Sequence, residues 1–214
     1  MKIYKFGGAS IKDAESIKNV ANILQQEGTD NCLLVVSAMG KMTNAFENIV
    51  NAYFDDEQKI QETILLVTNF HSEIVDDLFP NDHQIHQEIT ILIGKIVVFL
   101  AQNKSKEYDY LYDQIVCYGE LLATTILSSY LNHVGIENTL KDVRILIKTD
   151  SIFRDATVNW EETEQQINSQ IDSSKLTIVQ GFIGGDSKGN TTTLGREGSD
   201  YTAGIFAYCL NAEI

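Results

Sequence analysis

Residues 191–203 read TTTLGREGSDYTA, and the rest of the chain is organised around this stretch. The threonines predict the end of a strand. Gly195 and Gly198 predict a tight turn, because glycine adopts backbone conformations that a side chain forbids. Residues 201–210 follow with apolar positions that predict a buried helix. The stretch therefore predicts a strand, a glycine turn and a helix.

The polar residues of this turn suit an anion. Ser199 or Asp200 is expected to cap the helix. A helix N-terminus carries unpaired N–H groups and roughly half a positive charge, so it favours a phosphate or a carboxylate. Arg196 adds a planar fork for the same class of ligand. Taken alone, the turn is equally compatible with an ordinary connection that carries a solvated arginine.

Composition narrows the class of protein. The chain has 214 residues, of which 43% are hydrophobic and 21% charged, with a formal net charge of −14. This profile is typical of a soluble globular domain. The negative charge argues against nucleic acid or a membrane surface as the main partner. An anionic substrate remains compatible, because a few local cations and helix ends can build a site.

The cysteines and the apolar runs indicate a cytoplasmic protein. Cys32, Cys117 and Cys209 lie in apolar stretches without metal or disulfide spacing, and we expect reduced core residues. The N-terminus lacks the pattern of a signal peptide, and no apolar run is expected to approach the length of a membrane span.

Two glycine loops follow strands near the N-terminus. Residues 1–6 predict a short strand that runs into Gly7-Gly8-Ala9-Ser10, and a helix follows. Residues 32–36 are continuously apolar, which is typical of a strand buried on both faces of a parallel sheet. They run into the small polar loop of residues 37–44. In such βαβ units, ligands bind outside the carboxyl ends of the strands, so both loops should open on one edge.

The middle of the chain, residues 45–131, is predicted to be helical almost throughout. Breaks are expected near residues 55–56, 80–81 and 102–106. Residues 108–131 predict one long helix with Gly119 in its interior, where glycine costs about 1 kcal/mol relative to alanine. Gly119 therefore indicates a close approach by backbone or ligand. From these residues alone, the favoured explanation is that Gly119 lets two helices touch and that Glu120 faces water.

Strands are expected again at residues 139–143 and 176–180. A hairpin over residues 181–193 should return the arginine motif to the same sheet.

Taken together, Lys5 and the polar loops contain the groups that phosphoryl transfer uses: a lysine, glycine amides, hydroxyls, an arginine and an acidic residue. No Walker loop, protein-kinase signature or nucleophilic triad is present, and no residue is assigned as a protein metal ligand. The histidines lie away from the loops and are expected to be structural or at the surface: His71, His83, His86 and His133.

Five segments, in order and at suitable spacing, resemble aspartokinase. They are KFGGAS at 5–10, VSA with MTN at 36–44, YGE at 118–120, QGFIG at 180–184, and the stretch at 191–203. The lysine–glycine loop is shared with other amino-acid kinases, whereas the serine–threonine loop and the arginine motif are more specific.

The resemblance implies a fold and an activity. The fold is an α/β, three-layer αβα sandwich with a mainly parallel sheet, here with a helical insert. The activity is phosphorylation of the side-chain carboxylate of L-aspartate by ATP and Mg²⁺, which begins lysine, threonine and methionine biosynthesis. L-aspartate and ATP are the expected partners, and we expect a homo-oligomer.

The resemblance also implies residue roles. Lys5 and Asp200 would be catalytic. The phosphate-binding residues would be Lys5, Gly7, Gly8, Ser10 and Ser37. The aspartate-binding residues would be Ser37, Thr43, Glu120, Phe182, Arg196 and Ser199, with Glu120 facing the amino group and Arg196 the α-carboxylate.

The chain departs from the family pattern at several points. Ala9 stands where threonine is common, and Glu197 replaces a common glycine, which brings negative charge toward the phosphate. Residues 1–214 are expected to be an incomplete catalytic domain, without the later segments that bind adenine and ribose and without regulatory ACT domains. The alternatives are a glutamate or acetylglutamate kinase, or a non-catalytic fragment that binds aspartate.

Overall fold

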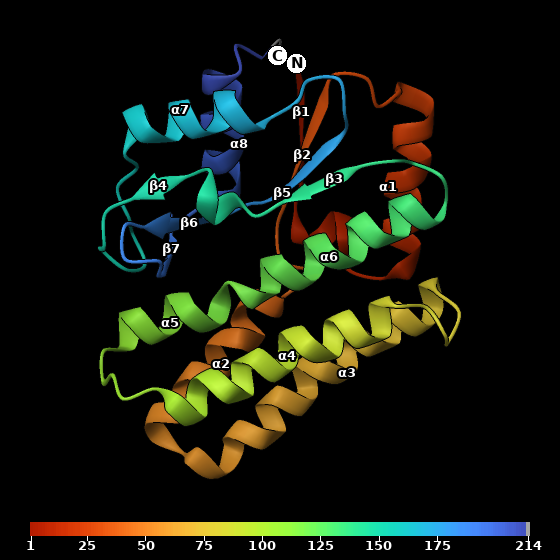
Figure 1. The fold of residues 1–214 in the computed structure, drawn as a ribbon. Coiled ribbons are helices and arrows are strands. Elements are labelled where there is room, and N and C mark those ends of the chain that lie inside the picture. The colour runs from red at the N-terminus through yellow and green to blue at the C-terminus, as the bar shows by residue number, and fades with distance from the viewer. Residues whose placement is uncertain (213–214) are drawn as a thin grey trace.

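The computed structural model describes residues 1–212, and its centre is a parallel sheet of four strands in the order β1-β2-β5-β3 (Figure 1). These strands are β1 (Lys2–Phe6), β2 (Cys32–Val36), β5 (Thr177–Gln180) and β3 (Thr139–Lys141). Phe6 pairs with Val36, and Val36 pairs with Gln180, so three strands end at the same level. The loops that follow these strands therefore emerge side by side.

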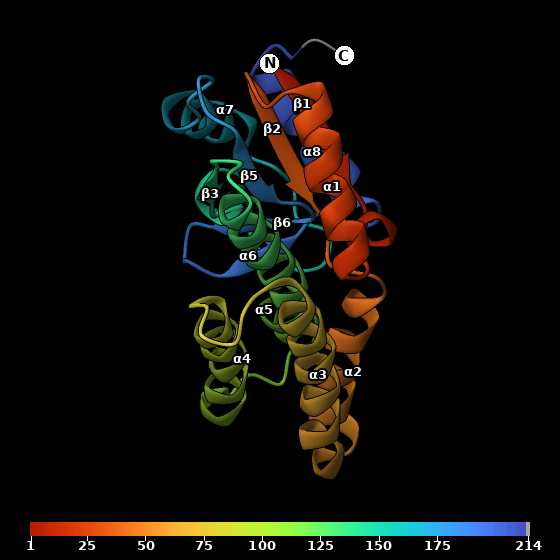
Figure 2. The ribbon, with the colours of Figure 1, turned by 90° about the vertical axis from the view of Figure 1, so that its right-hand side faces the viewer.

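The continuous apolar run of β2 is explained by burial on both faces. Leu34 belongs to the hydrophobic core on one side of the sheet, and Leu33 and Val35 belong to the core on the other side. On the first side lie α1 (Ala14–Glu27) and α6 (Tyr118–His133), and on the second lie α7 (Trp160–Gln170) and α8 (Gly198–Cys209). Helices thus cover both faces, which confirms the predicted three-layer αβα sandwich (Figures 1 and 2).

The predicted helical insert is also confirmed, and it projects beyond the sheet on the side of the strands' carboxyl ends (Figure 2). Its helices are α2 (Met42–Asp55), α3 (Ile60–Leu78), α4 (Ile85–Gln102) and α5 (Tyr108–Val116). Short 3-10 helices occur at Gly8–Ile11, Glu57–Lys59 and Val143–Ile145. The three predicted breaks fall between these helices.

The single long helix expected at residues 108–131 is wrong, because the chain bends at Cys117 between α5 and α6. Gly119 consequently lies in the first turn of α6. A Cβ atom on Gly119 would lie 2.9 Å from Cβ of Ala38 and 3.4 Å from the ring of Phe46. The close approach that Gly119 indicated is real, and it brings α6 against the loop after β2.

The arginine motif does not return to the four-stranded sheet, contrary to expectation. The hairpin forms as predicted, with β6 (Ile183–Asp186) antiparallel to β7 (Thr191–Thr193). It pairs instead with β4 (Lys148–Thr149) in a separate sheet of order β4-β6-β7. The strand expected at residues 139–143 ends at Lys141, and the following 3-10 turn leads the chain to this second sheet.

The expectation that no apolar run approaches the length of a membrane span is wrong for α4. This helix has 18 residues with a mean hydropathy of 1.4, which meets the length and composition of a span. A core helix meets the same criterion, and one face of α4 is indeed buried through Ile85, Ile89, Ile93 and Ile96. Its hydropathy is therefore weak evidence for a membrane.

Candidate functional site

A cavity of about 260 Å³ lies where the loops after β1, β2 and β5 meet the turn after β7. We call the segment Leu194–Gly198 the arginine turn. The residues that line the cavity are Lys5, Gly8, Ser37, Ala38, Gly40, Thr43, Glu120, Phe182, Gly195, Glu197, Gly198, Ser199 and Asp200. The predicted convergence of the polar loops on one sheet edge is therefore observed.

The two N-terminal glycine loops pack against each other on one wall of the cavity. The Gly40 amide donates a hydrogen bond to the carbonyl oxygen of Gly8 at 3.0 Å. A Cβ atom on Gly8 would lie 2.6 Å from the carbonyl oxygen of Gly40 and 2.8 Å from that of Ala38. Since backbone atoms cannot move aside cheaply, Gly8 is required for this contact.

The Lys5 side chain pairs with Asp200, another residue of the cavity lining. Its Nζ lies 3.1 Å from Oδ1 of Asp200 and 3.1 Å from Oδ2. Lys5 comes from β1 and Asp200 from the first turn of α8, so the pair joins the two ends of the chain. The same Nζ would be 3.3 Å from a Cβ atom on Gly7, which places the ammonium over the first glycine loop.

Glu120 forms a buried acidic wall of the cavity and is 2% exposed. Its Oε1 accepts a hydrogen bond from the Ala38 amide at 3.2 Å. Its Oε2 has no hydrogen-bond partner among residues 1–212. Burial raises the pKa of Glu120 to about 8, and the hydrogen bond from Ala38 opposes that rise only in part. A buried carboxylate with a free oxygen is costly unless a cation comes to it.

The start of α8 differs from the predicted cap. The helix begins at Gly198, and its N-cap residue is Glu197 in the left-handed region (φ 55°), without a capping hydrogen bond from its side chain. Ser199 and Asp200 therefore lie in the first helical turn and do not cap. This arrangement leaves both side chains at the cavity, where Asp200 pairs with Lys5.

Phe182 and Ser199 hold the loop after β5 against α8. Phe182 has a φ of 71°, which is uncommon for an aromatic residue. A Cβ atom on Gly198 would lie 2.6 Å from the Phe182 ring, and one on Gly181 would lie 2.6 Å from Oγ of Ser199. These close approaches explain why glycine follows β5 and precedes Ser199.

Three predicted site residues lie outside the cavity lining. Gly7 is under the Lys5 ammonium, and Ser10 is exposed in the 3-10 helix that follows. Arg196 is exposed at the apex of the arginine turn. The structure therefore leaves these three residues out of the cavity lining, and their assigned roles stay predictions.

Sequence reasoning missed several contributors to the site. The amide of Ala38 and the backbone at Gly40 were not singled out, although both lie in the loop that was predicted to bind phosphate. Asp113 is a buried carboxylate that holds β7, and no local pattern revealed it.

The residues expected to be structural lie as anticipated. His71 is fully buried against Phe46 and Phe70, and the three cysteines are free and buried. Within residues 1–212, no group of three or more His, Cys, Asp or Glu side chains could hold a metal ion.

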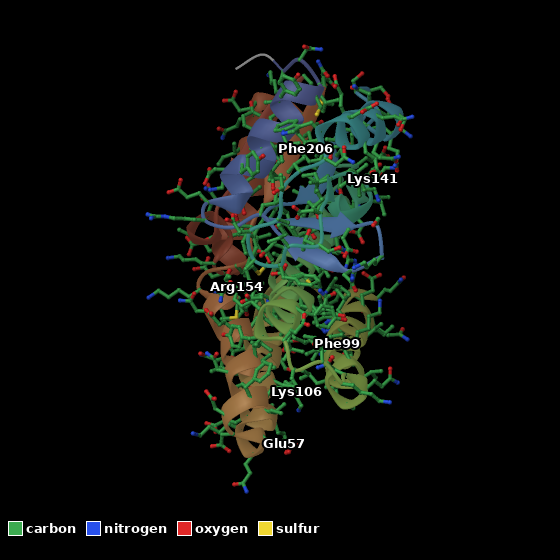
Figure 3. The ribbon with its side chains drawn as sticks, turned by 90° about the vertical axis from the view of Figure 1, so that its left-hand side faces the viewer. Glu57, Phe99, Lys106, Lys141, Arg154 and Phe206 are labelled. Atoms are coloured by element: carbon green, nitrogen blue, oxygen red, sulfur yellow. The ribbon has the colours of Figure 1, made fainter. Side chains whose placement is uncertain are left out.

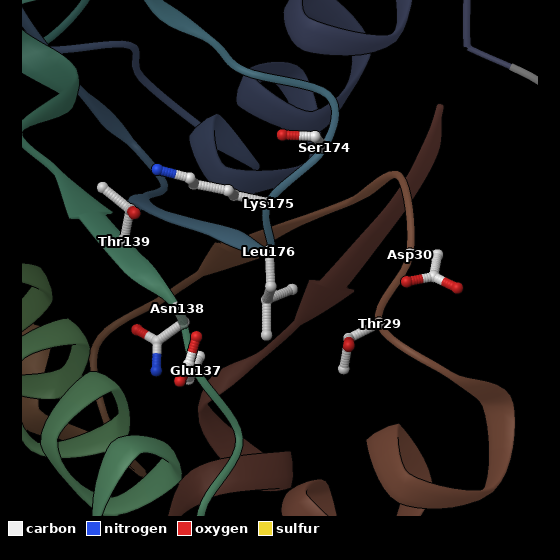
Figure 4. A pocket seen from close by; sticks show the side chains of 8 residues that line it. All are labelled: Thr29, Asp30, Glu137, Asn138, Thr139, Ser174, Lys175 and Leu176. Atoms are coloured by element: carbon white, nitrogen blue, oxygen red, sulfur yellow. The ribbon is translucent and has the colours of Figure 1, made fainter.

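A second hollow, of about 340 Å³, lies at the opposite ends of the strands (Figure 4). It is lined by the first residue of β3 and by residues that precede β2, β3 and β5: Thr29, Asp30, Glu137, Asn138, Thr139, Ser174, Lys175 and Leu176. Although it is larger, it lies at the amino ends of the strands, whereas ligands of such sheets bind beyond the carboxyl ends. The smaller cavity is the candidate site.

The chain belongs to the amino acid kinase family, whose sequence profile matches residues 1–214. It is 31% identical to lysine-sensitive aspartokinase 3 of Escherichia coli over 98% of the chain and 46% of that protein. It is 30% identical to the bifunctional aspartokinase/homoserine dehydrogenase of Buchnera aphidicola over 99% of the chain and 27% of that protein. It is thus a member of the amino acid kinase family that is similar in sequence to aspartokinases.

Solved structures agree with this assignment. E. coli aspartokinase III in complex with lysine and aspartate matches with a TM-score of 0.90 and 30% identity, over 99% of this chain and 47% of that one. The same enzyme with aspartate and ADP matches with a TM-score of 0.88 over the same shares. The chain therefore spans about half the length of the E. coli aspartokinase that it matches.

Proposed function

We propose that this protein transfers the γ-phosphoryl group of ATP to the side-chain carboxylate of L-aspartate. A carboxylate oxygen of aspartate attacks the γ-phosphorus, and the bond from that phosphorus to the β–γ bridging oxygen breaks. The products are 4-phospho-L-aspartate and ADP. No proton has to move in this step, so the protein's task is positioning and charge neutralisation.

The observation that carries the proposal is the buried carboxylate of Glu120, with one oxygen unpartnered at the cavity. The α-ammonium of an amino acid supplies the missing cation. N-acetylglutamate has no such charge, so this observation argues against an acetylglutamate kinase. Glutamate carries the ammonium but is longer by one methylene, which a fitted pocket discriminates by about 1–3 kcal/mol.

Lys5 and the glycine loops support the phosphoryl-transfer step. Of the described lining residues, Lys5 is the only cation, whereas Glu120, Glu197 and Asp200 are acidic. Its ammonium would exchange part of its contact with Asp200 for the transferring phosphoryl oxygens, where it neutralises developing charge. Gly8 and Ser37 lie on the wall from which backbone and hydroxyl groups would contact phosphate. Arg196, at the apex of the arginine turn, would contact the α-carboxylate of aspartate.

The residues of this site fit a Mg²⁺ ion that binds together with the phosphates of ATP. Magnesium usually keeps several waters and binds one or two protein carboxylates together with substrate phosphates, so a cluster of protein ligands is not required. Asp200, a carboxylate at the cavity beside the Lys5 ammonium, would hold it. When bound, Mg²⁺ would neutralise phosphate charge. The aspartate and ADP bound by the E. coli relative support this choice of substrates.

The test is coupled ADP production with aspartate, glutamate and N-acetylglutamate as acceptors. We expect the 214-residue chain alone to turn over negligibly and the same chain joined to the C-terminal half of the E. coli relative to use aspartate. The reason is that donor and acceptor must be held in line, and such positioning accounts for roughly 7–11 kcal/mol of a barrier. A preference for another acceptor would contradict the proposed substrate, and comparable turnover by both proteins would contradict the incomplete ATP site.

A Lys5→Ala variant tests the catalytic assignment in the active fusion. It should lower kcat by about a hundredfold or more, while KM for aspartate changes little, because the ammonium acts mainly in the transition state. A raised KM with kcat preserved would place Lys5 in substrate binding instead.

A further inference from the structure

A second buried carboxylate, Asp113 on α5, lies outside the cavity and holds the strand that leads into the arginine turn. Its Oδ1 accepts a hydrogen bond from Oγ1 of Thr193 at 2.8 Å, and its Oδ2 accepts from the Thr193 amide at 2.9 Å. Oδ2 also accepts from the Arg154 amide at 3.0 Å. Burial raises the pKa of Asp113 to about 6, and these hydrogen bonds oppose the rise. At pH 7 the group is therefore mainly the carboxylate that these three donors need.

The partners of Asp113 are the two segments that border the arginine turn. Thr193 is the last residue of β7, directly before the turn, and its carbonyl oxygen accepts from the Ala156 amide at 3.0 Å. A Cβ atom on Gly195 would lie 2.5 Å from Oδ1 of Asp155. We call residues 154–156, in the segment between β4 and α7, the tip. The tip thus packs against the arginine turn itself. Asp113 binds both the entrance of the turn and the tip that supports it.

The tip is also fastened to the helical part of the molecule by the Arg154 side chain. The guanidinium lies 4.3 Å from the centroid of the Tyr112 ring, and it pairs with Asp109 at 3.4 Å and with Glu47 at 3.8 Å. The Arg154 backbone has a φ of 69°. Figure 3 shows Arg154 at the level where the helical insert meets the sheets. Side-chain and backbone contacts therefore fix the tip to α5, and the pair with Glu47 adds a contact to α2.

We propose that Asp113 is a positioning residue for the arginine turn, fixing Thr193 and the tip at 154–156 so that Arg196 and Ser199 meet the substrate. This inference rests on the proposed function for the identity of the substrate, but the mechanical role of Asp113 does not depend on it. Asp113 touches no lining residue through a hydrogen bond in the described chain, so its effect on binding passes through the turn.

The first measurement is independent of any ligand. Arg196 is exposed, so trypsin can cleave after it once the turn loosens. Asp113→Asn keeps the volume but leaves only one acceptor oxygen for three donors. Cleavage after Arg196 should become about tenfold faster well below the melting temperature, since local opening costs less free energy.

The matched control is Ser128→Ala. Ser128 is 7% exposed on α6 and donates to Oδ1 of Asn138 at 2.7 Å, so it is another nearly buried polar anchor. Its loss should lower overall stability without changing cleavage after Arg196. Equal rates in Asp113→Asn and the control would overturn the proposal. If Asp113→Asn does not fold, Thr193→Val removes the hydroxyl bond alone and is measured instead.

The second measurement is a double-mutant cycle on the dissociation constant for aspartate, measured by calorimetry. Asp113→Asn should weaken aspartate binding about tenfold in the wild-type background, and by less than about twofold when Arg196 is already alanine. Equal effects in both backgrounds would show that Asp113 is merely structural. If the wild-type protein binds no aspartate, the proposed function fails, and the tryptic rates still decide whether Asp113 positions the turn.

Discussion

Two buried carboxylates, Glu120 at the cavity and Asp113 behind the arginine turn, differ in the number of hydrogen bonds that they accept. Asp113 is fully buried and uses both oxygens to accept three hydrogen bonds. Glu120 is 2% exposed and accepts one hydrogen bond, from the Ala38 amide, with Oε2 unpartnered. Burial raises both pKa values, to about 6 for Asp113 and about 8 for Glu120.

The difference agrees with a supporting role for Asp113 in the fold and with the proposed role of Glu120 in binding a cationic ligand. The donors around Asp113 are backbone amides and a threonine hydroxyl of the same chain, so part of the cost of burying its charge is offset without any ligand. Glu120 lacks such compensation, and its charged form is stabilised only when a cation enters the cavity. Unsatisfied buried polar groups are rare in native proteins, so each one needs an explanation.

The largest expected effect comes from Glu120→Gln. It should weaken aspartate binding by roughly 2–5 kcal/mol, because a neutral amide leaves the substrate ammonium without its partner. Calorimetry with Glu120→Gln and wild-type protein measures this loss. Retention of affinity within about threefold would remove Glu120 from the substrate site.

The same Glu120→Gln variant should be more stable than wild type in alkaline solution. The folded pKa of about 8 lies above the ordinary value of 4.5, so wild-type stability from this group is present below pH 4.5 and is lost as the pH rises to 8. The stability gained by Gln should therefore grow between pH 4.5 and 8 and then level off. Urea unfolding at several pH values measures it, and a loss of stability at pH 8 would contradict the comparison.

Asp113→Ala should change stability in the opposite direction. Removing the carboxylate leaves the amides of Thr193 and Arg154 and a hydroxyl without their acceptor, which should cost about 2–3 kcal/mol of unfolding free energy at pH 7. Chemical denaturation of Asp113→Ala measures this loss. Glu120→Ala is the control, because the Glu120 carboxylate accepts a hydrogen bond from only one donor. Equal losses would mean that the two sites do not differ as their hydrogen bonds indicate.

Aspartate affinity should itself depend on pH through Glu120. The substrate ammonium binds the carboxylate form, so the dissociation constant should fall as the pH rises from 6 toward 8, by up to about tenfold per pH unit. Above pH 8 the dependence should level off. Calorimetric titrations across this range test it, and Glu120→Gln should show a flat profile.

The smallest expected effect concerns Glu197, an exposed carboxylate at the cavity in the left-handed region. Glu197→Gly should raise the unfolding free energy by about 1 kcal/mol, because glycine adopts this conformation without strain. Glu197→Ala is the matched control, since it removes the charge but keeps the strain. If Glu197→Gly and Glu197→Ala tighten ATP binding equally, the negative charge of Glu197 weakens ATP binding in the wild-type protein. If only the glycine variant is stabilised, the strain is real.

Local patterns were sufficient for much of the fold. The apolar run at residues 32–36 and the glycines after two strands predicted a parallel sheet with its loops on one edge, and the apolar spacing predicted the helical insert. The resemblance to aspartokinase named the candidate site residues, and most of them line one cavity. Sequence reasoning reached this far because strand, turn and helix preferences act over a few neighbouring residues.

The sequence by itself thus determined the class of fold, the edge of the sheet that carries the site and most of the residues there. Only the tertiary structure decided that β7 joins a second sheet, that Asp113 accepts from Thr193 80 residues away, and that Lys5 pairs with Asp200 195 residues away. It also decided that Glu120 keeps a free oxygen. Burial and hydrogen-bond compensation depend on groups that are distant in the chain, so no local pattern records whether a carboxylate supports the fold or awaits a ligand.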